Sequence, residues 1–167
     1  MEVAALALGA NLGDRLSTLR RAVEALRDDG LAVHLSALYE TAPWGDSDQP
    51  DYLNAVAAVE GDTGEDWLRW ARSLEASADR RRDPQRQYGP RTLDVDVIEV
   101  WRRGRPLVQA GPELTLPHPR AAERAFVLVP LAEVLPDREL AGLGRIRDLA
   151  RAVPRRPGDL RLVAERW

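Results

Sequence analysis

The sequence predicts an α+β fold in which helices pack on a mainly antiparallel sheet. Segments whose apolar residues alternate, as in strands, are interleaved with segments whose apolar residues recur at helical spacing. The chain has 167 residues, enough for one substantial core, and no shift in composition marks a linker. We therefore expect a single domain over residues 1–167.

A strand, a helix and a second strand are predicted first. Residues 3–8 form a short apolar run that is closed by a glycine-containing turn at 9–13. A helix follows, because apolar residues recur at helical spacing; these are Leu16, Leu19, Val23 and Leu26. The period then changes to two, which predicts a strand with one apolar face made of Leu31, Val33, Leu35, Ala37 and Tyr39.

The next three elements are a loop, a strand and a helix. Proline, glycine and polar turn formers fill residues 41–50, so a loop is expected there, followed by a strand over 52–60. Residues 63–66 resemble a capping box. The stripe behind it predicts an amphipathic helix through Trp67, Ala71, Leu74 and Ala78.

An arginine-rich stretch at 80–91 leads into a strand over 93–101, a hairpin turn at 102–105 and a return segment at 106–109. Prolines then break up the chain, at 112, 117, 119 and 130, so that 120–135 is expected as short helical pieces, with a further short helix over 145–153. The order of elements is that of a ferredoxin-like βαββαβ core with C-terminal additions.

Composition excludes several kinds of chemistry. All 24 basic residues are Arg, against 27 acidic residues, and the chain contains no Lys and no Cys. A Schiff-base or P-loop lysine, a thiolate nucleophile, a disulfide and a cysteine-ligated zinc are therefore excluded. Two His make a His-rich metal site improbable. No apolar run approaches the roughly 18 residues of a membrane span, and residues 1–15 do not read as a signal peptide, so we expect a cytoplasmic protein.

The most informative residues are Asp94 and Asp96. A strand from Leu93 places both carboxylates on one face and the apolar residues between them on the other. Adjacent like charges repel unless a cation lies between them, and Mg²⁺ is bound through one or two carboxylates together with water and substrate phosphates. The alternative is an exposed strand face with two solvated aspartates, and a bare Asp-x-Asp pattern taken alone favours this alternative, because it is short and Asp is common.

Positive charge is concentrated around this pair. Residues 69–124 contain 12 Arg against 8 acidic residues, whereas the remaining 111 residues contain 12 Arg against 19. Guanidinium groups bind phosphate oxygens bidentately, so carboxylates beside an arginine cluster indicate a metal and polyphosphate site. The cluster alone is also compatible with a solvated helix end.

A second group of residues suits a flat heteroaromatic ligand. Tyr52 and Asn54 share a strand face, offering an aromatic plane and an amide that both donates and accepts. Phe126 is the only Phe in the chain and can supply the opposing plane, although both aromatic residues are also compatible with ordinary core positions. His118 lies between two prolines, either as a ligand to phosphate or ribose or as a loop cap.

Four ordered motifs together resemble the 6-hydroxymethyl-7,8-dihydropterin pyrophosphokinase family. They are Leu8-Gly9-Ala10-Asn11-Leu12-Gly13-Asp14, then Tyr39-Glu40-Thr41 with Asp48-Gln49-Pro50-Asp51-Tyr52-Leu53-Asn54-Ala55, then Gly89-Pro90-Arg91-Thr92-Leu93-Asp94-Val95-Asp96, and Leu116-Pro117-His118-Pro119-Arg120 with Arg124 and Phe126. The resemblance extends from Ala7 to about Pro136. It implies transfer of the terminal diphosphate of ATP to the pterin hydroxymethyl group, with release of AMP, in folate biosynthesis.

The resemblance also implies residue roles. Asp94 and Asp96 would hold two Mg²⁺ ions, and the catalytic arginines would be Arg80, Arg82 and Arg91. The pterin would be bound by Thr41, Pro43, Trp44, Tyr52, Asn54 and Phe126. ATP would contact Glu75, Arg82, Tyr88, Arg91, Ile98, His118 and Arg124.

Two other classes of function compete with this interpretation. A non-catalytic module binding nucleic acid or a regulatory nucleotide would show aromatic residues across the sheet face and a basic balance, but the chain has a net charge of -3 and 5% aromatic residues. A duplicated enzyme that has lost activity would not be expected to keep Asp94, Asp96, Arg91, Tyr52 and Asn54 together. We therefore expect ATP and the pterin as partners, with no nucleic acid, no membrane and a monomeric state.

Overall fold

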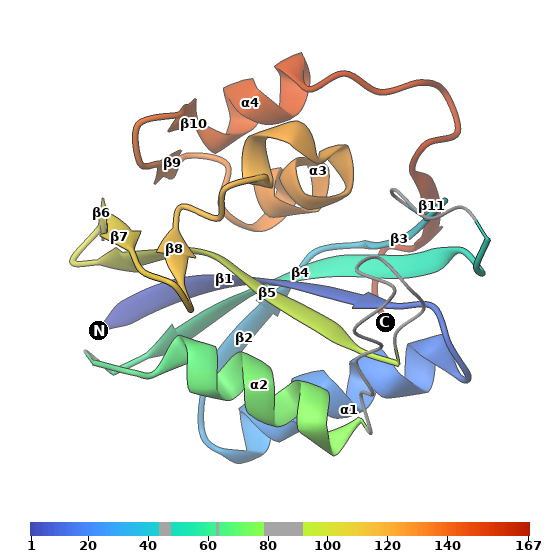
Figure 1. Ribbon diagram of the computed structural model, residues 1–167, viewed down its shortest axis with the longest axis horizontal. Coiled ribbons are helices and arrows are strands. Elements are labelled where there is room, and N and C mark those ends of the chain that lie inside the picture. Colours follow the sequence, from blue (N-terminus) through green and yellow to red (C-terminus); the bar gives the residue numbers. More distant parts are fainter. Residues whose placement is uncertain (44–47, 63, 79–91) are drawn as a thin grey trace.

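The computed structural model describes residues 1–43, 48–62, 64–78 and 92–167. Its centre is a seven-stranded sheet whose pairs are all antiparallel (Figure 1). Strand β1 (Glu2–Ala10) lies in the middle, between β4 (Tyr52–Gly61) and β5 (Asp94–Arg102). Strands β2 (Ala32–Leu35) and β3 (Leu38–Thr41) both pair with β4.

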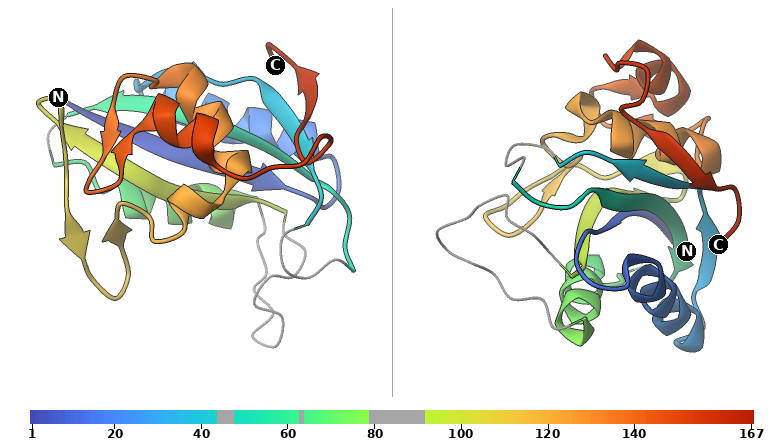
Figure 2. Two further views of the ribbon diagram at one scale, coloured as in Figure 1. Left: turned by 90° about the horizontal axis from the view of Figure 1, so that it is seen from above. Right: turned by 90° about the vertical axis from the view of Figure 1, so that its right-hand side faces the viewer.

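Helices cover both faces of this sheet. Helices α1 (Arg15–Asp28) and α2 (Trp67–Ser77) pack on one face, and α3 (Ala125–Val134) and α4 (Ile146–Ala152) form a layer over the other (Figures 1 and 2). Each face has its own hydrophobic core, one centred on Leu6 and Leu8 with α1 and α2, the other on Ala5, Ile98 and α3. The strand order β3-β4-β1-β5 confirms the ferredoxin-like core that the sequence predicts.

The edges and the C-terminal region consist of short elements. Strand β6 (Arg105–Pro106) pairs with β5 through a turn at Arg103 and Gly104, both with positive φ, which confirms the predicted hairpin. Sequence analysis missed the other short elements: β7 (Gln109–Ala110), β8 (Thr115–Leu116), β9 (Glu139–Leu140), β10 (Gly144–Arg145) and β11 (Arg161–Ala164). A 3-10 turn, η1 (Ala121–Glu123), precedes α3.

Strand β11 forms the sheet edge beside β3 and is tied to it by charge. The Arg161 guanidinium donates to the Glu40 carboxylate, which also accepts from Arg15 Nη2 at 2.9 Å. These partners, Arg161 first, lower the pKa of Glu40 against the opposing effect of burial. One carboxylate therefore joins the edge strand, β3 and the start of α1.

The first strand is longer than predicted. Gly9 and Ala10 continue β1 instead of opening a turn, because each still pairs with β4, and Gly9 also pairs with Asp94 of β5. Ladder hydrogen bonding on both sides outweighs the weak strand preference of glycine.

The strand predicted over residues 31–39 is interrupted. Leu35 faces Ala57 and Tyr39 faces Asn54, so residues 36–38 stand opposite only two residues of β4. This β-bulge reverses the alternation: Leu38 joins the core beneath α1 and α2, whereas Tyr39 points to the α3 side. The prediction that Tyr39 shares a face with Val33 and Leu35 is therefore wrong.

Two helix predictions also need correction. Pro130 lies inside α3 instead of ending a helical piece, and the buried packing of that helix compensates for the hydrogen bond that proline cannot donate. Helix α2 begins after Asp66, whose Oδ1 accepts from Arg69 N at 2.9 Å, so Asp66 is the N-cap. Thr63 of the predicted capping box lies outside the described residues.

Every helix in the described part of the chain is too short or too polar to cross a bilayer.

Glu2 ties the far end of the sheet to α2. Its side chain is 1% exposed and accepts three hydrogen bonds, from Arg102 Nε at 2.6 Å, Trp67 Nε1 at 3.1 Å and Gly64 N at 3.2 Å. Burial on its own raises the pKa of Glu2, but these donors, led by Arg102, outweigh it and lower the pKa below 4.5. The carboxylate is therefore held in its charged form.

Replacing this carboxylate tests the network. We expect Glu2→Gln to lower the free energy of unfolding at pH 7 by about 1–3 kcal/mol, because a buried, charged acceptor of three hydrogen bonds is lost. A group with a lowered pKa stabilises the fold above its unfolded value, so the difference from wild type should shrink as pH falls below 4.5. Urea unfolding at several pH values measures this.

Glu24→Gln, on the exposed side of α1, is the matched control. A Glu2→Gln chain as stable as this control at pH 7 would show that the network contributes nothing.

Candidate active site

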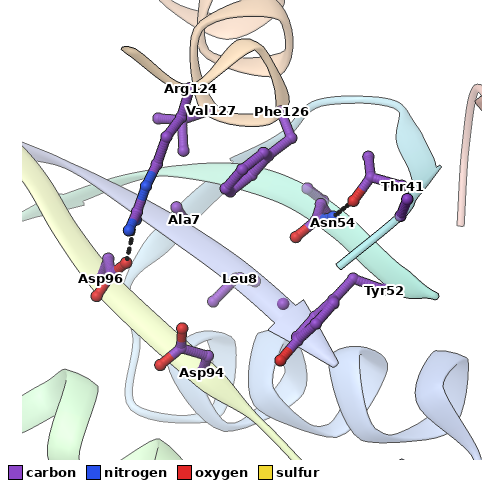
Figure 3. A pocket seen from close by; sticks show the side chains of 13 residues that line it. Ala7, Leu8, Thr41, Tyr52, Asn54, Asp94, Asp96, Arg124, Phe126 and Val127 are labelled. Carbon is purple, nitrogen blue, oxygen red and sulfur yellow. Dashed lines mark hydrogen bonds and ion pairs between the residues drawn. The ribbon is translucent and has the colours of Figure 1, made fainter. Parts of the chain in front are cut away.

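A pocket opens between the start of α3 and the end of the sheet where β1 finishes (Figure 3). Its lining residues come from four strands, the residue after β3, and the N-cap and first turn of α3. They are Ala7, Leu8, Gly9, Thr41, Ala42, Tyr52, Asn54, Ala55, Asp94, Asp96, Arg124, Phe126 and Val127.

The floor of the pocket is formed by small residues of the central strand. Gly9 pairs with Asn54 on one side and with Asp94 on the other, and Ala7 pairs with Asp96. A Cβ at Gly9 would lie 3.0 Å from Asn54 Oδ1 and 3.6 Å from Tyr52 Cδ1, closer to the amide than real Cβ atoms normally come. The space between the polar residues of β4 and those of β5 therefore depends on glycine.

One wall presents an aromatic ring and an oriented amide. Asn54, only 7% exposed, donates from Nδ2 to Thr41 Oγ1 at 2.6 Å, so its amide orientation is fixed. Tyr52 donates its hydroxyl to Gln49 Oε1 at 3.3 Å, and Gln49 in turn accepts from Asn11 Nδ2 at 2.9 Å. Tyr52 and Asn54 share one strand face, as the period of two predicts.

Phe126 approaches from α3 on the opposite side of the pocket from Tyr52 (Figure 3). The Arg124 guanidinium carbon lies 5.6 Å from the Phe126 ring centroid, within the range of a cation–π contact. Two aromatic rings thus border one pocket from two elements. A planar ligand fits such an arrangement.

The other wall carries the two carboxylates. Asp94 and Asp96 line the pocket, while Leu93, Val95 and Val97 are buried beneath α1 and α2, which confirms the predicted alternation. Asp96 Oδ2 lies 3.3 Å from Arg124 Nη1 and 3.8 Å from His118 Nε2. The strand is therefore more than a solvated face, because both carboxylates border a pocket and Asp96 lies beside a guanidinium and an imidazole there.

Of the two roles that the sequence left open for His118, its contacts bear out the loop cap; binding of phosphate or ribose stays a prediction. Its backbone N–H donates to Ile98 O at 2.8 Å, and its Nδ1 accepts from Arg120 N at 3.2 Å, so it caps its own loop. With Nδ1 accepting, the neutral ring carries its proton on Nε2, toward Asp96. Burial, followed by Arg124, lowers the pKa of His118 against the opposing effects of Asp96 and Asp94, which favours this neutral form.

Four described residues of the predicted site are not among the residues that line the pocket: His118, whose Nε2 lies 3.8 Å from Asp96 Oδ2, and Glu75, Ile98 and Pro43. Glu75 is 7% exposed on α2, beneath the opposite face, where Oε1 accepts from Val95 N at 3.0 Å. Ile98 is fully buried in the core under α3. Pro43 follows β3 but is not among the lining residues. Five others lie outside the described residues: Trp44, Arg80, Arg82, Tyr88 and Arg91.

Six lining residues were not among the predicted site residues: Ala7, Leu8, Gly9, Ala42, Ala55 and Val127. Three of them gave a signal, since Leu8, Gly9 and Ala55 belong to the motifs that carry the family resemblance, although Gly9 was expected in a turn. In the described part of the chain no three acidic or histidine side chains are grouped as a metal site. The pair Asp94 and Asp96 suits an ion that takes its other ligands from water and a substrate.

Comparison with known proteins gives one family. The model of 7,8-dihydro-6-hydroxymethylpterin-pyrophosphokinase (HPPK) matches residues 5–136. Two relatives are named 2-amino-4-hydroxy-6-hydroxymethyldihydropteridine pyrophosphokinase. The protein of Mycobacterium tuberculosis is 41% identical over 87% of this chain and 79% of its own length, and that of Methylorubrum extorquens is 43% identical over 85% and 88%.

Solved structures share the fold. An HPPK-DHPS chain in complex with substrates aligns with a TM-score of 0.62 at 11% identity, over 91% of this chain and 45% of that one. Plasmodium falciparum HPPK-DHPS aligns with a TM-score of 0.61 at 13% identity, over 90% and 43%. This chain spans less than half the length of either. With the family model spanning most of its residues and relatives above 40% identity, the chain belongs to the 7,8-dihydro-6-hydroxymethylpterin-pyrophosphokinase family.

Proposed function

We propose that the pocket between α3 and the sheet is where the terminal diphosphate of ATP is transferred to 6-hydroxymethyl-7,8-dihydropterin, releasing AMP, in folate biosynthesis. The pterin hydroxyl oxygen forms a bond to the β-phosphorus, the bond from that phosphorus to the oxygen bridging it to the α-phosphorus breaks, and the hydroxyl proton is released. The observation that supports this best is the register of β1, which places an aromatic and amide wall opposite a carboxylate wall.

The pterin is assigned to the side of the pocket bounded by β3, β4 and α3. Its ring lies between Tyr52 and Phe126, and the fixed amide of Asn54 hydrogen-bonds its polar edge, with the orientation set by Thr41. Pro43 and Trp44 complete the pterin set by family resemblance. Because the amide is already oriented, little ordering is needed when the ligand binds.

The phosphates are assigned to the side bounded by β5. Asp94 and Asp96 fit the role of holding two Mg²⁺ ions, since both carboxylates are partly exposed, share one face and border the pocket. When bound, such ions supply charge neutralisation to a polyphosphate. Arg124 and His118 flank Asp96, which supports their proposed role as donors to phosphate oxygens. The other ATP contacts rest on resemblance: Glu75, Arg82, Tyr88, Arg91 and Ile98, with Arg80, Arg82 and Arg91 as the catalytic arginines.

The residues of this chain act by positioning and by electrostatics. Tyr52, Phe126 and Asn54 hold the pterin so that its hydroxymethyl group points toward the carboxylate wall, which aligns the oxygen with the β-phosphorus. His118 keeps its proton on Nε2 and serves as a donor, not as a general base. Arg124 adds a guanidinium where negative charge develops.

The proposal takes residues 1–167 as one catalytic domain that works as a monomer in the cytoplasm, with ATP and the pterin as its only partners. Both hydrophobic cores pack on the same sheet, which supports treating the described chain as one unit. Any further partner would have to bind outside the pocket, on a surface that takes no part in the proposed reaction.

Substitution of a carboxylate tests the reaction. We expect Asp96→Asn to lower the rate of AMP formation from ATP, Mg²⁺ and the hydroxymethyl-dihydropterin at least about 100-fold, because a charge at the phosphate wall is lost. Glu113→Gln, a 66% exposed carboxylate paired with Arg72, is the matched control and should keep wild-type activity. AMP formation without pterin, or full activity in Asp96→Asn, would contradict the proposal.

Binding of the two substrates should be coupled. We expect the pterin to bind about 5–150-fold more tightly when a nonhydrolysable ATP analogue and Mg²⁺ are present, because both ligands occupy adjoining walls of one pocket. Calorimetry measures the pterin dissociation constant with and without the analogue. Equal constants in the two titrations would show that the walls act independently.

A further inference from the structure

Glu133, in the last turn of α3, joins this helix to β3. Its Oε2 accepts from the Ala37 backbone N–H at 2.7 Å, and its Oε1 accepts from the Tyr39 hydroxyl. Both partners lie 94 or more residues away along the chain. We refer to these three residues as the α3–β3 latch.

The bulge before β3 supplies one of the two donors. Residues 36–38 stand opposite two residues of β4, so one backbone N–H has no partner in the ladder. Ser36 meets Val56 through its backbone N–H and its Oγ, and Ala37 N–H donates to Glu133 instead. The bulge also turns Tyr39 toward α3, so both hydrogen bonds depend on the same irregularity.

The latch and Phe126 lie on one stripe of α3. Glu133 follows Phe126 by seven residues, which is nearly two turns and about 10 Å along the helix axis. Such residues share a helix face. The contact that holds Glu133 against β3 therefore limits rotation of α3 about its axis, and such a rotation would move the Phe126 ring toward or away from the pocket.

Strand β3, which the latch joins to α3, forms part of the pocket wall opposite Phe126. Tyr39 pairs directly with Asn54, and Thr41 pairs with Tyr52. The latch thus connects the two sides of the pocket, one bearing Phe126 and the other bearing Tyr52 and Asn54 (Figure 3). Arg124, by contrast, is held separately, by Asp96 of β5 at 3.3 Å.

We propose that Glu133 is a positioning residue for the pterin side of the reaction, acting through Tyr39 and Ala37 to fix the spacing of Phe126 from Tyr52 and Asn54. The inference rests on the proposed function, because it assigns the pterin to the space between these rings. It adds a residue that touches neither substrate.

Two properties make the latch testable without unfolding the chain. Glu133 is exposed, so its removal leaves no cavity in the core. Burial first, and then the Glu133 carboxylate, raise the pKa of Tyr39 to about 12, so that its hydroxyl remains a donor throughout the pH range of an assay.

The experiment compares Tyr39→Phe, Glu133→Ala and the double variant by calorimetry with the hydroxymethyl-dihydropterin and, separately, with an ATP analogue and Mg²⁺. We expect the pterin dissociation constant to rise about 3-fold in Tyr39→Phe and about 10-fold in Glu133→Ala, scaled to one and two lost hydrogen bonds. The double variant should equal Glu133→Ala, since both changes act on the same latch. The constant for the ATP analogue should stay within 2-fold of wild type.

Asp148→Ala is the matched control, because this carboxylate lies on α4 in the same layer and contacts only Arg151, at 4.0 Å, among the contacts of the described residues. It should leave both constants unchanged. A merely structural latch would lower the unfolding temperature and weaken pterin and ATP binding alike.

Three outcomes overturn the inference. If the wild type binds pterin and the pterin dissociation constants of Tyr39→Phe and Glu133→Ala lie within 2-fold of its value, the inference is overturned but the proposed function is not. The same holds if the variants bind pterin and the ATP analogue with equally weakened affinity. A wild-type chain that binds no pterin would overturn the proposed function, and the inference with it. Tyr39→Phe removes a single hydroxyl, so it gives a result even where Glu133→Ala yields little folded protein.

Discussion

The double antiparallel pairing of β1 determines the shape of the site. Gly9 is paired with Asn54 on one side and Asp94 on the other, and Ala7 with Asp96, so groups from two distant parts of the sequence lie on one face with only small residues between them. Because side chains alternate, a slip of one residue would turn Ala7 and Gly9 toward the core of α1 and α2 and point the Leu8 side chain into the space that these small residues leave open. The site thus depends on a register that the two cores enforce.

Burial separates the carboxylates that stabilise the fold from those available for chemistry. Glu2 and Glu99 are 1% and 0% exposed, and each accepts only from groups of the protein itself. Burial raises the pKa of Glu99 even though the Val100 and Ala141 N–H groups oppose it. Asp94 and Asp96 instead remain partly exposed at the pocket. Position relative to the core, more than residue type, decides which acid can meet a substrate.

Most of the correct predictions came from the local spacing of apolar and polar residues. Predictions from this spacing failed where groups far away in the sequence determine the backbone conformation. The face shared by Asp94 and Asp96 follows from a period of two, as does that of Tyr52 and Asn54. The bulge at 36–38 continues an alternating pattern without any local signal, because its spare N–H is satisfied by Glu133, almost a hundred residues later. The role of Gly9 was equally hidden, since a missing side chain matters only when its neighbours on two other strands are known.

The ion pair of Glu40 with a residue far along the chain has a consequence for folding during protein synthesis. Its partner Arg161 follows it by 121 residues, and β11 cannot close the edge beside β3 before that residue has been added. At a synthesis rate of roughly 5–20 residues per second, about 6–24 s pass between the addition of Glu40 and the addition of Arg161. During this time the edge of β3 is open, and pairing with the strand of another nascent chain competes with completion of the chain's own sheet.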